Sequence, residues 1–182
     1  MKYCKQNPMK KNIFVTGSPG VGKTTLIQKV LDNIPPGISS CGFFTNELRE
    51  SGIRVGFEIT TLNGLRGILS HTRFKTKHRV GKYGVDVAGF EELVLPFLHS
   101  EKTQIFVVDE IGKMECFSEK FCLKMAALLD SDSPVFGSIA LKGGGFIGEV
   151  RLRKDVEIVL VTHENRDSLV PILAQRISRM LL

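Results

Sequence analysis

A glycine-rich segment near the start of the chain constrains the fold more than any other feature. Residues 17–24 read Gly-Ser-Pro-Gly-Val-Gly-Lys-Thr, which fits the pattern of Gly, any four residues, and then Gly-Lys-Ser/Thr. An apolar run at 13–15 precedes this segment, and apolar residues at helical spacing follow it as far as Ile34. A buried strand, a tight loop and a helix in this order form a phosphate-binding loop. The pattern therefore predicts a nucleotide-binding α/β domain.

The residue types in this Walker A loop match the chemistry of a bound triphosphate. Gly20 and Gly22 let the backbone bend so that successive N–H groups point at phosphate oxygens. Lys23 supplies a positive charge for the β- and γ-phosphates, and the Thr24 hydroxyl is a candidate ligand for Mg²⁺. The candidate nucleotide-binding residues in this loop are Gly17, Ser18, Pro19, Gly20, Val21, Gly22, Lys23, Thr24 and Thr25.

A second apolar run, at 105–108, ends in the acidic pair Asp109-Glu110. Such a strand delivers its last residues to the carboxyl edge of a sheet, where Asp109 is a second candidate ligand for Mg²⁺. Glu110 is a candidate catalytic base that activates water for attack on the γ-phosphorus, unless it only caps the following segment. Lys113 is either a cation that neutralises charge on the γ-phosphate or an exposed lysine.

Strands and helices alternate over most of the 182 residues, which predicts one domain over 1–182 with a mostly parallel sheet covered on both faces. The irregular part is a β-hairpin near 41–61 with a turn at 49–52, followed by a basic loop at 71–83. Residues 1–11 are expected to form a flexible tail. Further strands are expected at 135–141 and 156–161, and further helices at 90–99, 117–129 and 169–181.

Charge and composition limit the classes of partner. The net charge of +6 is local, because residues 1–11 and 73–82 together carry +9 and the remaining 161 residues carry −3. The body of the domain is therefore not a basic nucleic-acid-binding surface, and a nucleic-acid partner through 73–82 is the less favoured interpretation. No secretory signal or apolar run of about 18 residues is present, so we expect a cytoplasmic protein without a membrane span. Four cysteines without metal-ligand spacing are expected to be free thiols.

Several segments together resemble a known family, the small P-loop nucleoside triphosphatases of thermophiles and their cancer-related human relatives. The most specific segment is Asp109-Glu-Ile-Gly-Lys-Met-Glu115, and the others follow in the family's order. Those segments are 42–47, 66–70, 79–83 and 164–166. Phe44 and Asn46 depart from the Tyr and Glu expected there, so any role of those two side chains in positioning the substrate is in doubt.

The resemblance implies an activity and a sheet order that spacing alone does not give. The activity is Mg²⁺-dependent hydrolysis of ATP, GTP and other nucleoside triphosphates to diphosphate and phosphate. The fold is a three-layer P-loop sandwich with a RecA-like strand order, in which the strand before Asp109 is not directly beside the strand before Gly17. Nucleoside triphosphates are the expected ligands, Mg²⁺ is the expected cofactor, and we expect no obligate protein partner.

Polar residues outside the two main motifs are open to two interpretations. Asn165 and Arg166 follow the last strand, where they either contact the nucleotide base or begin the C-terminal helix. Arg66 and Arg79 flank the basic loop, where they either contact phosphates or are solvated.

Two other functions remain open at this point. The first is a nucleotide or nucleoside kinase, since kinases share the loop and the chain length. The second is a nucleotide-gated module that binds nucleic acid or a protein.

Overall fold

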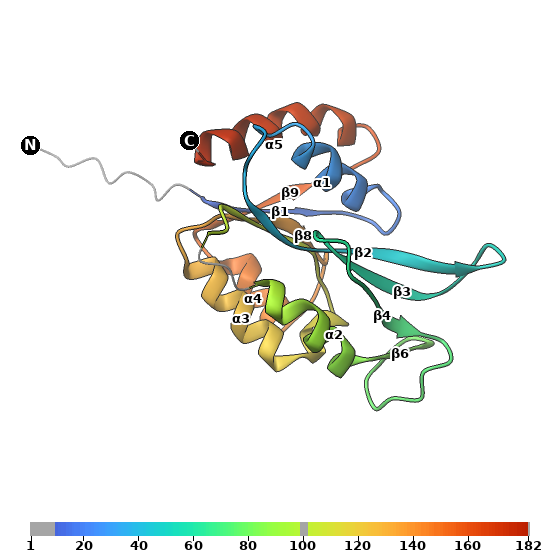
Figure 1. Ribbon diagram of the computed structural model, residues 1–182. Coiled ribbons are helices and arrows are strands. Elements are labelled where there is room, and N and C mark those ends of the chain that lie inside the picture. Colours follow the sequence, from blue (N-terminus) through green and yellow to red (C-terminus); the bar gives the residue numbers. More distant parts are fainter. Residues whose placement is uncertain (1–9, 99–101, 182) are drawn as a thin grey trace, which may run out of the picture.

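A computed structural model of the chain describes residues 10–98 and 102–181. It is a nine-stranded sheet with helices on both faces (Figure 1). The strands are β1 Asn12–Thr16, β2 Ser40–Glu50, β3 Ile53–Thr61, β4 Arg66–His71, β5 Arg79–Val80, β6 Tyr83–Val85, β7 Ile105–Ile111, β8 Val135–Ile139 and β9 Val156–Leu160. The α-helices are α1 Lys23–Leu31, α2 Val87–Val94, α3 Glu119–Asp130, α4 Phe146–Leu152 and α5 Arg166–Leu181, and 3-10 turns span Leu95–Leu98 and Glu115–Phe117.

The strand order is β5-β6-β4-β3-β2-β7-β8-β1-β9. Its half from β2 to β9 is parallel throughout, which is the arrangement expected for strands joined by helical crossovers. Strand β8 lies between β1 and β7, so the strand that ends at Asp109 is not beside the strand that ends at the loop. The predicted RecA-like order is therefore confirmed.

Two layers of helices cover this sheet, because both faces of its central strands are apolar. Along β1, Phe14 packs into one core and its neighbours Ile13 and Val15 into the other, as the two-residue period of a strand requires. Helices α1 and α5 cover one face, while α2, α3 and α4 cover the other (Figure 1). The predicted three-layer sandwich is confirmed.

The predicted hairpin forms, but it belongs to a larger antiparallel extension. The first half of β2 pairs with β7, and β2 then runs on beside β3 to a turn at Ser51-Gly52. Strand β4 continues the extension, and β6 and β5 follow it in the region 71–83, where a loop was expected. Strands β5 and β6 have only two and three residues, which is too short for periodicity to reveal.

Other elements differ from the prediction at their ends. The helix expected at 90–99 begins earlier, since Asp86 caps α2 by accepting a hydrogen bond from the Gly89 N–H, and its last predicted residue lies outside the described residues. Ser118 caps α3 in the same way, so that helix starts after 117. Helix α4 was not predicted, because three glycines precede it.

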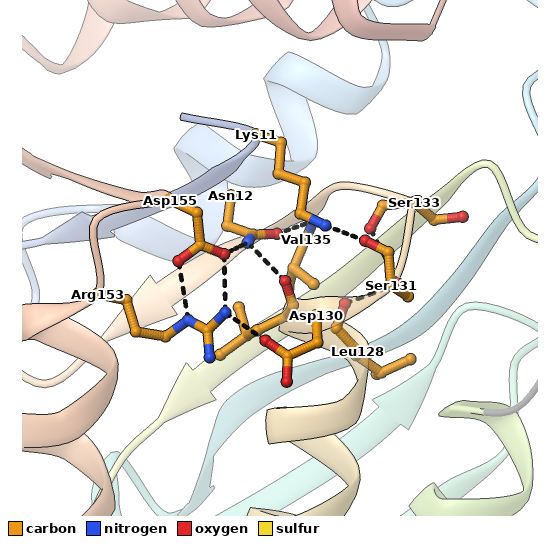
Figure 2. A network of polar contacts seen from close by, with 10 residues as sticks. Lys11, Asn12, Leu128, Asp130, Ser131, Ser133, Val135, Arg153 and Asp155 are labelled. Carbon is orange, nitrogen blue, oxygen red and sulfur yellow. Dashed lines mark hydrogen bonds and ion pairs between the residues drawn. The ribbon is translucent and has the colours of Figure 1, made fainter. Parts of the chain in front are cut away.

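A network of polar contacts closes the amino-terminal edge of the sheet (Figure 2). The side-chain amide of Asn12, which is fully buried, donates to the Leu129 carbonyl at 3.2 Å and to Asp155 at 3.0 Å. Its oxygen accepts a hydrogen bond from the Val135 N–H at 3.0 Å. Asp155 in turn accepts two hydrogen bonds from Arg153. The network joins β1, α3, β8 and the turn before β9.

Three further predictions concern the N-terminal tail, the cysteines and the absence of a membrane span. Of the expected flexible tail, residues 1–9 lie outside the described residues, and Lys11 donates a hydrogen bond to the Ser131 carbonyl. Cys41, Cys116 and Cys122 are free thiols as predicted, and Cys4 lies outside the described part. Within the described ranges, no helix is long and apolar enough to cross a membrane.

Candidate active site

The glycine-rich loop connects β1 to α1 in the conformation that its sequence predicts. Gly20 and Gly22 have φ angles of 76° and 101°, a left-handed conformation that favours glycine. Gly17 packs so closely that a Cβ atom there would lie 2.6 Å from the Val161 carbonyl oxygen. Gly22 is the N-cap of α1 and has no side chain there, so the first N–H groups of the helix stay available to an anion.

Lys23 lies over the loop from the first position of α1. Its ammonium group donates hydrogen bonds to the carbonyl oxygens of Gly17 at 3.1 Å and of Ser18 at 3.4 Å. These neutral acceptors are weaker partners for an ammonium than phosphate oxygens are. The oxygens of a bound phosphate chain can therefore replace these carbonyl groups as hydrogen-bond partners of Lys23.

Asp109 lies buried at the carboxyl end of β7 and meets Thr24 from α1. The Thr24 hydroxyl donates to Oδ2 of Asp109 at 2.6 Å, and the Ser138 hydroxyl donates to Oδ1. Burial raises the pKa of Asp109, while the hydrogen bonds from Ser138 and Thr24 oppose that rise. The Thr45 hydroxyl donates to the Asp109 carbonyl oxygen at 2.5 Å. The structure thus brings together the two side chains predicted to hold the metal.

This oxygen pair fits a magnesium ion. Mg²⁺ is usually held by one or two carboxylates together with substrate phosphates and water, and it prefers oxygen ligands. A hydroxyl and a carboxylate that converge beside a phosphate-binding loop meet that description. The described residues contain no group of three or more His, Cys, Asp or Glu side chains arranged to hold a metal, and a magnesium site of this kind does not need one.

Glu110 follows Asp109 and faces the same cleft. Among the described residues, no group donates a hydrogen bond to its carboxylate. Burial raises the pKa of Glu110, the Lys23 ammonium lowers it and the Asp109 carboxylate raises it. A half-buried carboxylate with a raised pKa and no donor is suited to accept a proton.

A second carboxyl group, Glu115, lies fully buried behind Glu110. Burial, and then the charge on Glu110, raise the pKa of Glu115 to about 8. Gly112 leaves room for both groups, since a Cβ atom there would lie 2.8 Å from an oxygen of Glu115 and 3.1 Å from one of Glu110. In the sequence, Glu115 only ends the segment that resembles the family, and no pattern indicates that its carboxyl group is buried beside Glu110.

The loop, Asp109 and Glu110 line one cleft of about 660 Å³ at the carboxyl edge of the sheet. The opposite wall comes from the β2–β3 hairpin, which was not predicted to line the site. The hairpin residues that line the cleft are Thr45, Asn46, Glu47, Arg54 and Phe57. The sequence held one signal for them, because Thr45 and Glu47 lie two residues apart on a strand and so share a face.

Arg54 is held in this wall by an acid and two aromatic rings. Its Nη1 donates to Glu47 at 2.5 Å and its Nε donates to the Tyr83 hydroxyl at 3.1 Å. Its guanidinium carbon lies 5.3 Å from the centroid of the Phe57 ring and 5.9 Å from that of Tyr83. The hydrogen bonds from Arg54 and Arg49 lower the pKa of Glu47, so this carboxylate is charged at neutral pH.

The predicted residues near the C-terminal helix have different positions. Arg166 lies against the loop, where its Nη1 donates to the Val21 carbonyl at 3.3 Å, and with Lys29 it lines a smaller cavity of about 190 Å³. Asn165 holds the turn before α5, because its Oδ1 accepts from the Thr162 N–H at 2.8 Å and its Nδ2 donates to the Leu160 carbonyl at 3.0 Å.

The remaining basic candidates do not line the cleft. Lys113 and Arg66 are exposed. Arg79 donates to the carbonyl oxygens of Phe74 and Lys82, so its guanidinium closes the basic loop on itself.

Comparison with proteins of known sequence finds relatives of the family that the motifs resemble, and the similarity extends over nearly the whole chain. A cancer-related nucleoside-triphosphatase homolog of Bos taurus is 41% identical over 179 residues, which cover 90% of this chain and 94% of the relative. The nucleoside-triphosphatase THEP1 of Thermotoga maritima is 39% identical over 160 residues, covering 87% of this chain and 90% of the relative.

Solved structures agree with this likeness. The crystal structure of THEP1 from Aquifex aeolicus has a TM-score of 0.83 at 34% identity, covering 92% of this chain and 99% of that one. The solution structure of a human cancer-related nucleoside triphosphatase has a TM-score of 0.78 at 39% identity. The match covers 93% of this chain and 98% of that one. A family model described as NTPase matches residues 12–174. With that match and these relatives, the chain belongs to the NTPase family.

Proposed function

We propose that this chain hydrolyses nucleoside triphosphates to the diphosphate and phosphate with the help of Mg²⁺. The observation that carries the proposal is that Lys23, Thr24, Asp109 and Glu110 converge on one cleft at the carboxyl edge of the sheet. The names of the relatives agree with this activity, since they are curated as nucleoside triphosphatases.

In this proposal, the loop binds the phosphates and the region around α5 binds the rest of the nucleotide. The N–H groups at the start of α1 and the Lys23 ammonium hold the β- and γ-phosphates. Arg166 lies beside Gly22 and lines the small cavity next to the loop, so we assign its guanidinium to the base or sugar. Asn165 supports this site indirectly by holding the turn that presents Arg166.

Glu110 is the proposed base. Thr24 and Asp109 would hold the magnesium ion, which when bound supplies positive charge that offsets the charge on the phosphates. A water molecule beside Glu110 attacks the γ-phosphorus and gives its proton to the carboxylate. The new bond joins the water oxygen to phosphorus. The bond from phosphorus to the β–γ bridging oxygen breaks, and the diphosphate leaves with that electron pair.

The variant Glu110→Gln tests this role. It keeps the shape of the side chain but removes the proton acceptor, so we expect phosphate release to fall by about 100- to 10,000-fold. Affinity for the nucleotide, measured by titration calorimetry, should change little. Glu92→Gln is the matched control, because Glu92 is an exposed glutamate that does not line the cleft. Normal turnover by Glu110→Gln would contradict the proposal.

A phosphotransferase is the second candidate, and one observation favours it. The cleft continues past Glu110 to the polar wall formed by Asn46, Glu47 and Arg54, which leaves room for an acceptor larger than water. Incubation with Mg²⁺ and ATP, with and without nucleosides and nucleotides, distinguishes the two functions. Phosphate released without an acceptor supports hydrolysis, and transfer without release supports the kinase.

The structure offers no similar observation for a nucleic-acid-binding function. None of the residues at 73–82 lines the cleft. Within that loop, Arg73 pairs with Glu50 and Arg79 binds backbone carbonyls.

A further inference from the structure

Two positively charged side chains line the cleft among the described residues, and the proposed function uses only one of them. Lys23 comes from the loop, and Arg54 comes from β3 on the opposite wall. Hydrolysis of a triphosphate spreads negative charge over the terminal phosphate and the leaving oxygen. A cation on the far side of that phosphate from the loop is therefore in a place where it can stabilise the reaction.

The contacts of Arg54 direct its guanidinium back toward the sheet edge. Thr45 is bonded to Asp109 at that edge, and Glu47 is two residues further along the same strand, which is about 7 Å. Arg54 itself lies opposite Arg49, still further out, yet its Nη1 reaches inward to Glu47. The charged end of Arg54 is thus nearer to Glu110 than its backbone position implies.

Arg54 is well oriented but not locked in place. The Phe57 and Tyr83 rings and the Tyr83 hydroxyl fix the plane of its guanidinium. Its partner Glu47 is 34% exposed and Arg54 is 38% exposed, so water screens their ion pair. Glu47 also keeps a second partner, Arg49, at 2.6 Å, so its charge remains compensated if Arg54 leaves.

We propose that Arg54 contacts the terminal phosphate of the bound triphosphate and stabilises the charge that develops there, with Glu47 as its partner in the empty cleft. This inference rests on the proposed hydrolytic function. A guanidinium binds phosphate oxygens through two parallel N–H groups, and a triphosphate is a stronger partner than a screened carboxylate. The role that the sequence suggested for Lys113 is thereby assigned to Arg54, because Lys113 is exposed and does not line the cleft.

The test compares Arg54→Ala with Arg49→Ala. Both variants remove one guanidinium from Glu47, but Arg54 lines the cleft and Arg49 does not; Arg49 also donates to the Gly52 carbonyl in the hairpin turn. We expect Arg54→Ala to lower kcat by about 100- to 1,000-fold, as the loss of a positioned charge at a transition state does. Arg49→Ala should keep kcat within about twofold of the wild type.

Binding supplies a measurement that a merely structural role would not change. A contact with the terminal phosphate predicts that Arg54→Ala loses affinity for a non-hydrolysable triphosphate analogue and keeps its affinity for the diphosphate. Equal losses for both ligands, or the same kcat loss in Arg49→Ala, would overturn the inference by showing that the hairpin has only been disturbed. Arg54→Lys checks this further, because a folded variant with a point charge should recover part of kcat.

The outcomes separate the two proposals. If the wild-type chain binds no triphosphate or releases no phosphate, the proposed function fails. If the wild type hydrolyses ATP and Arg54→Ala does so at the same rate, the inference about Arg54 alone fails. A loss of kcat in Lys113→Ala with none in Arg54→Ala would return the role to Lys113.

Discussion

Two polar clusters lie at opposite edges of the same parallel sheet, and they differ in how their groups are paired. At the amino edge, both N–H groups of Asn12 donate and its oxygen accepts, all within the protein (Figure 2). At the carboxyl edge, the hydrogen bonds of Lys23 among the described residues go to carbonyl oxygens, and no described residue donates a hydrogen bond to Glu110. The first cluster is complete by itself, and in the proposed function the second becomes complete when a phosphorylated ligand binds. Mutations should therefore affect stability at one edge and activity at the other.

The largest effect is expected at the carboxyl edge. Lys23→Ala removes the charge that we propose holds the β- and γ-phosphates, so phosphate release should fall by about 1,000-fold. The free energy of unfolding, measured in urea, should change by less than about 1 kcal/mol, because the hydrogen bonds of Lys23 among the described residues go to two backbone carbonyl oxygens. Lys120→Ala, which removes an exposed lysine on α3, is the control. A large loss of stability in Lys23→Ala would break the contrast between the two edges.

The opposite pattern is expected at the amino edge. Asn12→Ala leaves the Val135 N–H and the Leu129 carbonyl without their buried partner, so we expect a loss of about 3 kcal/mol in the free energy of unfolding. The kcat of the folded variant should equal that of the wild type. Urea unfolding and phosphate release, measured on the same preparation, check both statements. A kcat loss without a stability loss would show that the two edges are coupled.

Glu115 lies at the carboxyl edge of the sheet but is buried like the groups at the amino edge. Its burial predicts how the free energy of unfolding depends on pH. Its pKa is raised from 4.5 to about 8 in the folded chain, so its contribution to stability is complete below pH 4.5 and is lost as the pH rises to about 8. Glu115→Gln cannot lose that contribution. Between pH 5 and pH 8.5, its free energy of unfolding should therefore rise relative to the wild type by about 4 kcal/mol.

The control for this pH effect is Glu119→Gln, which changes an exposed glutamate at the start of α3. Its unfolding curve should follow the wild type at both pH values. If Glu115→Gln and the wild type show the same pH dependence, Glu115 is ionised in the folded chain and the account of its burial is wrong.

The smallest effect on kcat is expected in the hairpin wall of the cleft, at Tyr83. Tyr83→Phe removes the hydroxyl that accepts the Arg54 Nε–H but keeps the ring beneath the guanidinium. One lost hydrogen bond of this kind costs about 1 kcal/mol, so kcat should fall by about fivefold. In the Arg54→Ala background the same change should have no effect on kcat, because the two side chains act together. Additive losses of kcat in the double variant would show that Tyr83 acts independently of Arg54.

The polar residues at the carboxyl edge of the sheet can be predicted from the sequence, but those at the amino edge cannot. The loop at 17–24 and the pair Asp109-Glu110 are readable because each is a short run that follows an apolar strand. The amino-edge network is not readable, since Asn12 bonds to groups more than 100 residues away in the sequence. The hairpin wall of the cleft is not readable either, because the orientation of Arg54 depends on strand pairing that brings Glu47 and Tyr83 to it from two other strands.

Strand order shows the same limit. Apolar runs predict each parallel strand, but placing β8 between β1 and β7 required the resemblance to a family. The short strands β4, β5 and β6 take their places by pairing with neighbours rather than by any pattern of their own. Ser138, which bonds to Asp109, lies inside an apolar strand that gave no sign of a polar role.

The central claim is that water, activated by Glu110, attacks the terminal phosphorus. Hydrolysis of ATP by the wild-type chain in ¹⁸O-labelled water, followed by mass spectrometry of the products, tests it directly. We expect one labelled oxygen in the released phosphate, none in ADP, and a rate at least about 100-fold lower in Glu110→Gln. Label in ADP, or phosphate that leaves ATP only when an acceptor is added, would contradict it.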